Sequence, residues 1–307
     1  MRFRPLGGSG IVVSSVSLAL ADSTVRARAN DWVSLIYASF ENGINAFEVT
    51  GLHPAISDGL TLALQAVERR LLFLAWRLGT RLSPSGGLMR DFSPDSLERT
   101  VDAVLARTGA EYLDAVILDD PGVEELSPQA LEALRNMRAD GRVHRLGVGG
   151  RDEALDAYIS TGAFDLLQIP FSLTSGWVER RRLRAAIDRD MGIMGYDYFP
   201  EAFQGGSDAR PKTSGWGRSN ASPLAGAGTY AFLQHTRNWT PEEICLAYAL
   251  TQPALATVQI NADRVERIEA LAAVPDRELP PGVSAQIEMA RFAATAEDPN
   301  DVKARRA

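Results

Sequence analysis

Short runs of apolar residues alternate with amphipathic stretches along almost the whole chain. The apolar runs are rich in aliphatic and β-branched side chains and are too continuous to be half-exposed, which is typical of parallel strands covered on both faces. Eight of these runs are predicted to be strands: residues 16–20, 44–48, 71–76, 113–118, 145–149, 164–169, 192–196 and 256–260.

Residues that begin and end helices delimit the stretches between these runs. In "SPDSLERTVDAVLARTG", Ser93 is expected to be the N-cap, Pro94 the first helical residue and Gly109 the residue after the helix. "SPQALEALRNMRADG" repeats the arrangement with Ser127 and Gly141, and "TPEEICLAYALTQP" begins in the same way. Three helices are therefore predicted at these places.

Eight strands that alternate with helices over 307 residues favour a closed (β/α)8 TIM barrel over an open doubly wound sheet. Before the first of them, "RFRPLGGSGIVVS" has two short apolar arms around a glycine-rich turn, which predicts a β-hairpin cap. We expect one α/β domain over residues 1–307, with a long loop at 200–239 after the seventh strand and a flexible tail at 295–307.

The composition is that of an ordinary globular protein, with 45% hydrophobic and 23% charged residues. A net charge of −7 gives no support to nucleic-acid binding. The single Cys245 excludes an internal disulfide and a multi-cysteine metal site. Apolar runs stay far below the roughly 20 residues of a membrane span, and the N-terminus does not resemble a signal peptide. We expect a cytoplasmic protein with no membrane span.

Polar side chains gather where the second, third and fourth predicted strands end. Glu48, His53, Arg77 and Asp119 are at these ends, and in a barrel the C-terminal ends of the strands carry the chemistry. One interpretation makes His53 a proton donor that Glu48 or Asp119 polarises. The other makes Arg77 an ion-pair partner that only holds the strand ends together, and the residue types slightly favour it. The three histidines are scattered, so no metal site is predicted.

Two glycine-rich segments, "LGVGG" and "GGSG", lack the spacing of phosphate-binding loops and are interpreted as turns. The helix expected after the last strand opens with "NADRVERIEAL". Arg264 and Arg267 near its N-terminus are candidates for holding a nucleotide phosphate.

Placed in order, these segments resemble the aldo-keto reductase family along nearly the whole chain. "GINAFEVTGLHP" is similar to the family's strand-2 motif GINFFDTAxxYG, and "LLFLAWRLG" to its strand-3 ATK segment. "YLDAVILDDP", "RLGVGG" and "FDLLQIPFSL" are similar to the segments of the next three strands. The resemblance implies a barrel that reduces carbonyl compounds with NAD(P)H.

The family's catalytic tetrad of Asp, Tyr, Lys and His is replaced at every position. By the resemblance, Glu48 occupies the Asp position, His53 the Tyr, Arg77 the Lys and Asp119 the His. An arginine does not supply the compact, tunable ammonium of a lysine, and Asp119 would repel a developing oxyanion. Only His53 keeps the chemistry of a proton donor. The resemblance therefore implies that no catalytic residue of the family's type remains.

The resemblance implies a partly retained cofactor site. Gln168 is at the position of the glutamine that contacts the nicotinamide carboxamide, Tyr196 at the stacking aromatic, and Arg267 at an arginine near the adenosine end. The family's Ser-Asn pair after strand 5 is replaced by Gly149 and Gly150, and the serine after the stacking tyrosine by Asp197. With Arg264, these are the expected cofactor residues for NAD(H) or NADP(H), with NAD(H) slightly preferred.

Three functions follow as hypotheses. The first is a catalytically impaired barrel that binds NAD(P)(H) and regulates protein partners, as in an oxidoreductase-like regulator of bacterial cell division. The second is an active NAD(P)H-dependent oxidoreductase with altered chemistry, in which His53 is the general acid. The third is an interaction scaffold that no longer binds the nucleotide.

Overall fold

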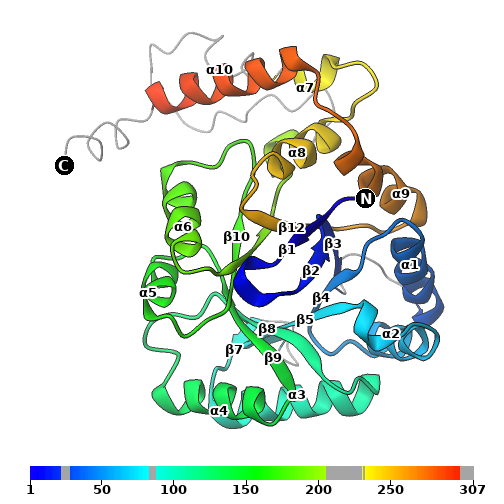
Figure 1. Ribbon diagram of the computed structural model, residues 1–307, viewed down its shortest axis with the longest axis vertical. Coiled ribbons are helices and arrows are strands. Elements are labelled where there is room, and N and C mark those ends of the chain that lie inside the picture. The colour runs from blue at the N-terminus through cyan, green and yellow to red at the C-terminus, as the bar shows by residue number, and fades with distance from the viewer. Residues whose placement is uncertain (22–27, 83–87, 205–229, 231, 298–307) are drawn as a thin grey trace.

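The computed structural model describes residues 1–21, 28–82, 88–204, 230 and 232–297, and its centre is a closed barrel of eight parallel strands (Figure 1). In chain order the barrel strands are β3 (Val16–Leu20), β4 (Ala46–Thr50), β5 (Phe73–Leu78), β8 (Leu113–Asp119), β9 (Val143–Gly149), β10 (Leu166–Pro170), β11 (Gly192–Tyr196) and β12 (Leu255–Ile260). β12 pairs with β3 and closes the ring. The predicted (β/α)8 TIM barrel is confirmed.

Helices surround the barrel and follow its strands. They are α1 (Ala29–Glu41), α2 (Pro54–Ala66), α3 (Pro94–Thr108), α4 (Pro128–Ala139), α5 (Ala154–Thr161), α6 (Trp177–Ile187), α7 (Phe232–His235), α8 (Pro241–Leu250), α9 (Val265–Ala273) and α10 (Pro281–Glu297). The helix starts predicted at Ser93, Ser127 and Thr240 are confirmed. The Ser127 and Thr240 hydroxyls accept hydrogen bonds from backbone N–H groups of the first helical turn, whereas Ser93 makes no side-chain cap bond.

The predicted N-terminal hairpin is confirmed and closes the end of the barrel where the strands begin. β1 (Phe3–Pro5) pairs with β2 (Val12–Ser14) in antiparallel register. Leu6, between them, is 0% exposed and packs in the inner core. The Arg4 guanidinium donates to the carbonyl oxygens of Leu250 and Leu255, which fastens the hairpin to α8 and β12. This end of the barrel is therefore covered by the hairpin, and we call the opposite end, where the strands end, the open end.

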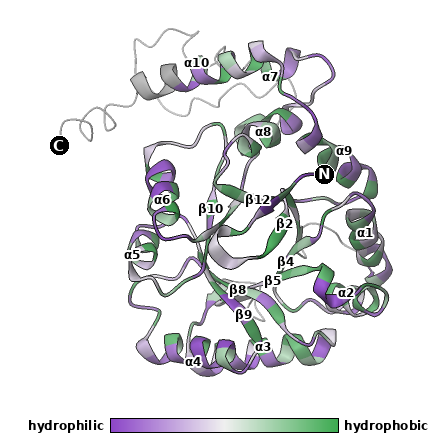
Figure 2. Cartoon of the chain, viewed as in Figure 1, coloured by the Kyte–Doolittle hydropathy of each residue, from purple (hydrophilic) through white to green (hydrophobic). Residues whose placement is uncertain are grey.

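The core has two layers separated by the barrel wall. Small and branched side chains from alternate strand positions fill the interior, among them Ala75, Ile117 and Met194. A larger cluster lies between the strands and the helices and includes Trp32 and Trp76. Figure 2 shows the strands and the inward faces of the helices as mostly hydrophobic. This arrangement buries both faces of every strand, which explains the continuous apolar runs.

Three barrel strands, β4, β5 and β10, begin two residues later than predicted. Asn45 exchanges hydrogen bonds with Ser14 of the hairpin, so β4 begins only at Ala46. A short 3₁₀ turn (Arg69–Leu71) includes the first residue of the strand predicted at 71–76, so β5 begins only at Phe73. Glu48 is consequently inside β4 rather than at its end.

Other segments depart from the sequence-based expectation or extend it. A second hairpin of β6 (Thr80–Leu82) and β7 (Leu88–Arg90) follows β5 and was not predicted. The loop expected at 200–239 contains a 3₁₀ turn (Glu201–Phe203) and α7, while 205–229 and 231 lie outside the described residues. In the expected tail, α10 continues to Glu297, and 298–307 lie outside the described residues. Within the described ranges, no helix is long and apolar enough to cross a membrane.

Candidate functional site

Four of the predicted site residues meet at the open end of the barrel. The Arg77 guanidinium on β5 donates from Nε to Glu48 Oε1 at 3.1 Å and from Nη1 to Asp119 Oδ1 at 2.6 Å. Its Nη2 donates to Gln168 Oε1. All three arms of the guanidinium are therefore engaged by neighbouring strands.

Two further hydrogen bonds complete this set of contacts. Gln168 Nε2 donates to Glu48 Oε2 at 2.5 Å, and Thr80 Oγ1 donates to Asp119 Oδ2 at 2.5 Å. Glu48 is 1% exposed and Gln168 is 0% exposed. We call Glu48, Arg77, Thr80, Asp119 and Gln168 the Arg77 network. It joins β4, β5, β8 and β10 across the mouth of the barrel.

The charges around Arg77 determine the protonation state of its guanidinium. Burial acts to lower the pKa of Arg77, but the negative charges of Glu48 and Asp119 outweigh burial, so the pKa is raised above its ordinary value. A guanidinium already binds its proton too tightly to exchange it during catalysis. Arg77 is therefore a permanent cation that pairs with two carboxylates, as the ion-pair interpretation of the sequence expected.

His53 is on the loop that leads from β4 into α2. It is the N-cap residue of α2, directly before Pro54, and its carbonyl oxygen accepts from the Ser57 N–H at 3.0 Å. The preceding turn passes through Gly51, whose φ of +77° belongs to the left-handed region that favours glycine. His53 thus lies at the open end of the barrel, and its role as a proton donor stays a prediction.

Tyr196 is the last residue of β11 and has two guanidinium groups beside its ring. The Cζ atoms of Arg77 and Arg151 lie 5.6 and 5.5 Å from the ring centroid. Burial raises the pKa of the Tyr196 phenol, although Arg151 and Arg77 oppose the increase. Arg151 also forms an ion pair with Asp197, where the sequence places an anion after the stacking position. Sequence reasoning missed Arg151, although its place directly after the two glycines at the end of β9 was a usable signal.

Asp120 requires a glycine at position 150, and Gly149 packs closely against Gln168. A Cβ atom on Gly150 would lie 1.8 Å from Asp120 Oδ1, and one on Gly149 would lie 3.1 Å from Gln168 Oε1. The Asp120 carboxylate instead accepts from the Arg151 N–H at 3.0 Å. The side chain of Asp120 therefore fills the space next to Gly150 that a larger residue there would need.

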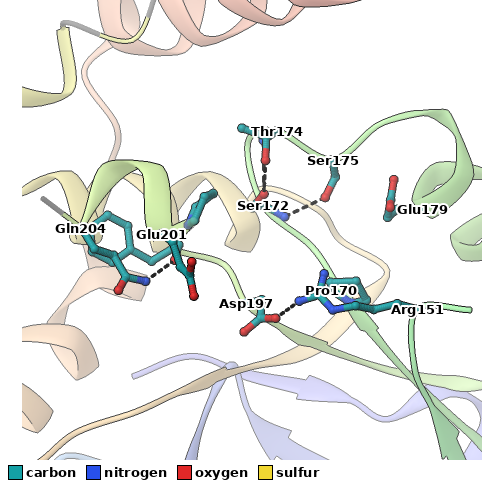
Figure 3. Close-up of a pocket in the computed structure, with 11 residues that line it drawn as sticks. Arg151, Pro170, Ser172, Thr174, Ser175, Glu179, Asp197, Glu201 and Gln204 are labelled. Atoms are coloured by element: carbon teal, nitrogen blue, oxygen red, sulfur yellow. Dashed lines mark hydrogen bonds and ion pairs between the residues drawn. The ribbon is translucent and has the colours of Figure 1, made fainter. Parts of the chain in front are cut away.

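An open cleft runs from this end of the barrel across the ends of β10, β11 and β12. One cavity, of about 410 Å³, lies between the loop after β10 and the residues after β11 (Figure 3). Its polar lining includes Arg151, Ser172 and Glu201. A second cavity, of about 420 Å³, extends toward α9 and shares Asp197, Phe199 and Gln204 with the first. The two cavities form one elongated cleft.

The α9 end of the cleft carries a three-residue cluster. Arg267 Nη2 donates to Glu242 Oε1 at 2.7 Å, and the Tyr198 hydroxyl donates to the same oxygen at 2.7 Å. Burial, followed by the charge of Glu242, raises the pKa of Tyr198 well above its ordinary value. Arg267 lines the cavity with a side chain that is 35% exposed, while its Nε is buried and has no hydrogen-bond partner among the described residues. Arg264 is exposed at the start of α9, 3.9 Å from Asp263.

The described part of the chain holds no group of three or more His, Cys, Asp or Glu side chains arranged to bind a metal ion.

Known proteins place this barrel in a family. The model of the aldo/keto reductase family matches residues 20–291. A curated relative, the NADH-specific methylglyoxal reductase of Escherichia coli, is 23% identical over 177 residues, which is 56% of this chain and 54% of that protein. The chain thus spans about half the length of this curated relative.

Solved structures share the fold at low identity. The holo form of an aldo-keto reductase from Bacillus halodurans superposes with a TM-score of 0.75 at 18% identity, over 94% of this chain and 96% of that one. A glycerol dehydrogenase of Gluconobacter oxydans gives 0.72 at 16% identity, over 97% of each chain. An aldo-keto reductase from Klebsiella pneumoniae in complex with NADPH gives 0.68 at 18% identity, over 94% and 95%. The chain is a member of the aldo/keto reductase family.

Proposed function

We propose that this chain is a member of the family that binds a nicotinamide dinucleotide in the cleft without the family's carbonyl-reducing proton relay. The observation that carries the proposal is the Arg77 network. A tetrad needs a proton donor whose pKa a neighbouring ammonium lowers, but Arg77 is shared among Glu48, Asp119 and Gln168. The positive charge of Arg77 is balanced by the carboxylates of Glu48 and Asp119, so it does not act on a proton donor.

Asp119 is a second feature that opposes carbonyl reduction. Carbonyl reduction develops negative charge on the substrate oxygen, and catalysis needs hydrogen-bond donors or positive charge at that point. Asp119 is 22% exposed beside Arg77 and supplies an anion there. Hydride transfer with this set of residues is therefore expected to be slow even when a dinucleotide is bound.

Several features of the cleft support dinucleotide binding. The two cavities lie side by side at the strand ends, and the guanidinium groups of Arg151 and Arg267 line them. Tyr196 directly precedes the lining residue Asp197 and offers an aromatic ring beside the cleft. When bound, the dinucleotide would supply hydride chemistry. The lining residues Arg151 and Arg267 would hold it, with Tyr196 beside the cleft, because Gln168 is fully buried in the Arg77 network.

Charge favours NAD(H) over NADP(H). The cavity at α9 is lined by the carboxylates of Asp197 and Glu242 and by one guanidinium, Arg267, which Glu242 already neutralises. Asp197 in turn pairs with Arg151. Among the described lining residues no cation is therefore left unpaired for the extra phosphate of NADP(H), whereas a ribose diol can donate to a carboxylate.

A binding titration tests both parts of the proposal. NADH is expected to bind saturably with a Kd at or below about 1 mM, and NADPH more weakly. Glu242→Gln removes one charge from the cavity and is expected to bring the two affinities closer by about tenfold. Glu243→Gln, on the same helix but paired with Arg277 outside the cavity, is the matched control and should leave the ratio unchanged. If neither nucleotide binds, the interaction-scaffold hypothesis replaces this one.

Turnover tests the catalytic part. With NADH and methylglyoxal, the substrate named for the Escherichia coli relative, we expect no oxidation above the uncatalysed rate. Steady oxidation that His53→Ala abolishes would refute the proposal and support the second candidate, an active reductase with His53 as general acid. That candidate is favoured by the reductase relatives and by the place of His53 at the open end. The regulatory role through a protein partner, including one in cell division, stays a prediction.

A further inference from the structure

The ion pair between Arg151 and Asp197 forms part of the wall of the cleft (Figure 3). Arg151 follows β9 and Asp197 follows β11, and β10 lies between these two strands in the barrel. Both side chains line the cavity of about 410 Å³, and they are 58% and 52% exposed. The pair therefore joins two loops over the end of β10 while it remains in contact with solvent.

The cations of the cleft are already neutralised by carboxylates. Among the described lining residues of the two cavities, Arg151 and Arg267 are the only cations. Arg151 pairs with Asp197, and the partner of Arg267 is Glu242. A dinucleotide carries two negatively charged phosphates, and arginine pairs especially well with phosphate oxygens. A phosphate can therefore gain a cation in this cleft only if one of the two pairs opens.

The two pairs differ in the carboxylate that opening would leave behind. Glu242 is 19% exposed and also accepts from the hydroxyl of Tyr198, which is itself buried. Separation from Arg267 would leave this carboxylate poorly solvated, which is costly. Asp197 is 52% exposed, so water can take the place of Arg151, and exposed ion pairs are weak. The Arg151–Asp197 pair is therefore the one that a phosphate can open.

The backbone that carries Arg151 is fixed on both sides of the residue. Its N–H donates to Asp120 Oδ1 at 3.0 Å, and its carbonyl oxygen accepts from Arg182 Nη1 at 2.8 Å. The Arg182 side chain is only 3% exposed and is further held by an ion pair with Asp156. A change of partner by Arg151 therefore requires rotation about side-chain bonds and no movement of the loop.

We propose that Asp197 is an internal competitor for the phosphates of the dinucleotide, and that the ligand binds by exchange of Arg151 from Asp197 to a phosphate oxygen. The inference rests on the proposed dinucleotide binding and names the residue that limits its affinity. Asp197 opposes binding in two ways. It holds the cation that the phosphate needs, and after release it remains as an anion near the phosphate. Loss of its charge should therefore tighten binding.

The backbone of Asp197 permits a clean removal of this charge. Its φ of +51° belongs to the left-handed region, which asparagine also adopts readily. Asp197→Asn therefore keeps the size and backbone conformation of the residue. Asp152→Asn is the matched control, because it removes a negative charge directly after Arg151 from a residue that does not line the two cavities.

Fluorescence titrations of the full-length protein with NADH measure the exchange. Asp197→Asn is expected to bind NADH about tenfold more tightly than the unchanged protein, and Arg151→Gln about tenfold more weakly. When Arg151→Gln is already present, Asp197→Asn should add no more than about threefold, because no cation is left to release. Asp152→Asn should stay within about twofold of the unchanged protein, since its charge is screened by solvent.

The other outcomes separate this inference from the proposed function. If NADH binds the unchanged protein and Asp197→Asn binds it no more tightly, the exchange is wrong and dinucleotide binding stands. If Asp152→Asn gives the same gain, or if the full gain persists beside Arg151→Gln, a general charge effect explains it and the exchange is also wrong. If NADH binds none of these forms, dinucleotide binding is wrong and the exchange is wrong with it. If Asp197→Asn does not fold, as judged by circular dichroism, Asp197→Gly allows the same φ and is read in the same way.

Discussion

Replacement of Arg77 by methionine is expected to cost more stability than replacement of any exposed arginine. The change keeps a long apolar stem but removes the cation that lies between Glu48 and Asp119. Glu48 is 1% exposed and would keep only Gln168 as a partner, while Asp119 would keep Thr80. Two carboxylates would then face each other at the barrel mouth without a counter-charge.

The size of this loss follows from burial. Removing one partner of a buried ion pair typically costs about 3–5 kcal/mol, because it leaves an uncompensated charge. The ion pair between Arg70 and Glu68 is a matched comparison, since its N–O distance is 2.7 Å but its side chains are 79% and 62% exposed. Exposed pairs contribute about 0–1 kcal/mol. Arg70→Met should therefore be nearly silent.

Urea and thermal unfolding of the two variants measure the difference. For Arg77→Met we expect a loss of about 3–5 kcal/mol, which is a fall in Tm of roughly 5–8 °C for a domain of this size. Adding Glu48→Gln should recover part of the loss, because it removes one of the two stranded charges. Equal losses for Arg77→Met and Arg70→Met, or no recovery in the double variant, would refute the reasoning that the Arg77 network stabilises the barrel mouth.

Three further predictions use other parts of the barrel. Gly150→Ala should destabilise the protein by about 1–3 kcal/mol more than Gly109→Ala in urea unfolding, because a Cβ at 150 meets Asp120 while one at 109 meets nothing within 4 Å; equal losses would contradict the steric argument. Burial raises the pKa of the Cys245 thiol, so a thiol reagent at pH 8 should label no cysteine in the folded protein and one in guanidinium. Burial and Glu242 raise the pKa of Tyr198, so its contribution to stability is complete below about pH 10 and is lost as the pH rises above the unfolded value. Tyr198→Phe should accordingly show a smaller fall in Tm between pH 9 and 11 than the unchanged protein, and an equal fall would contradict the assignment.

The sequence predicted the barrel well because its strands and helix caps are local signals. Continuous apolar runs indicated strands that are buried on both faces. A capping residue followed by proline indicated two helix starts, and in the structure the Ser127 and Thr240 side chains accept hydrogen bonds at these starts. The second hairpin was not predicted, although its strands have three residues each, as do the strands of the N-terminal hairpin, so strand length does not explain the difference.

The sequence identified the residues of the candidate site but not the hydrogen bonds that they form with one another. The four tetrad positions and Gln168 were all named, yet Gln168 was assigned to the cofactor and is found inside the Arg77 network. The length of the arginine side chain decides this, because Arg77 reaches across the barrel mouth to an amide on β10. Such a contact spans 91 residues of sequence and has no local signature.

The hairpin under the barrel has a consequence for protein engineering. Since Leu6 and Arg4 close the lower end and the two core layers fill the wall, the residues that hold the scaffold together are distinct from most of those at its rim. Much of the rim could therefore be redesigned without disturbing the core, whereas returning a lysine, tyrosine and histidine to the tetrad positions would remove the ion pairs of the Arg77 network and their contribution to stability. Such grafts would need to begin with Asp120 and Gly150, because that pair determines how much side chain the rim can accept.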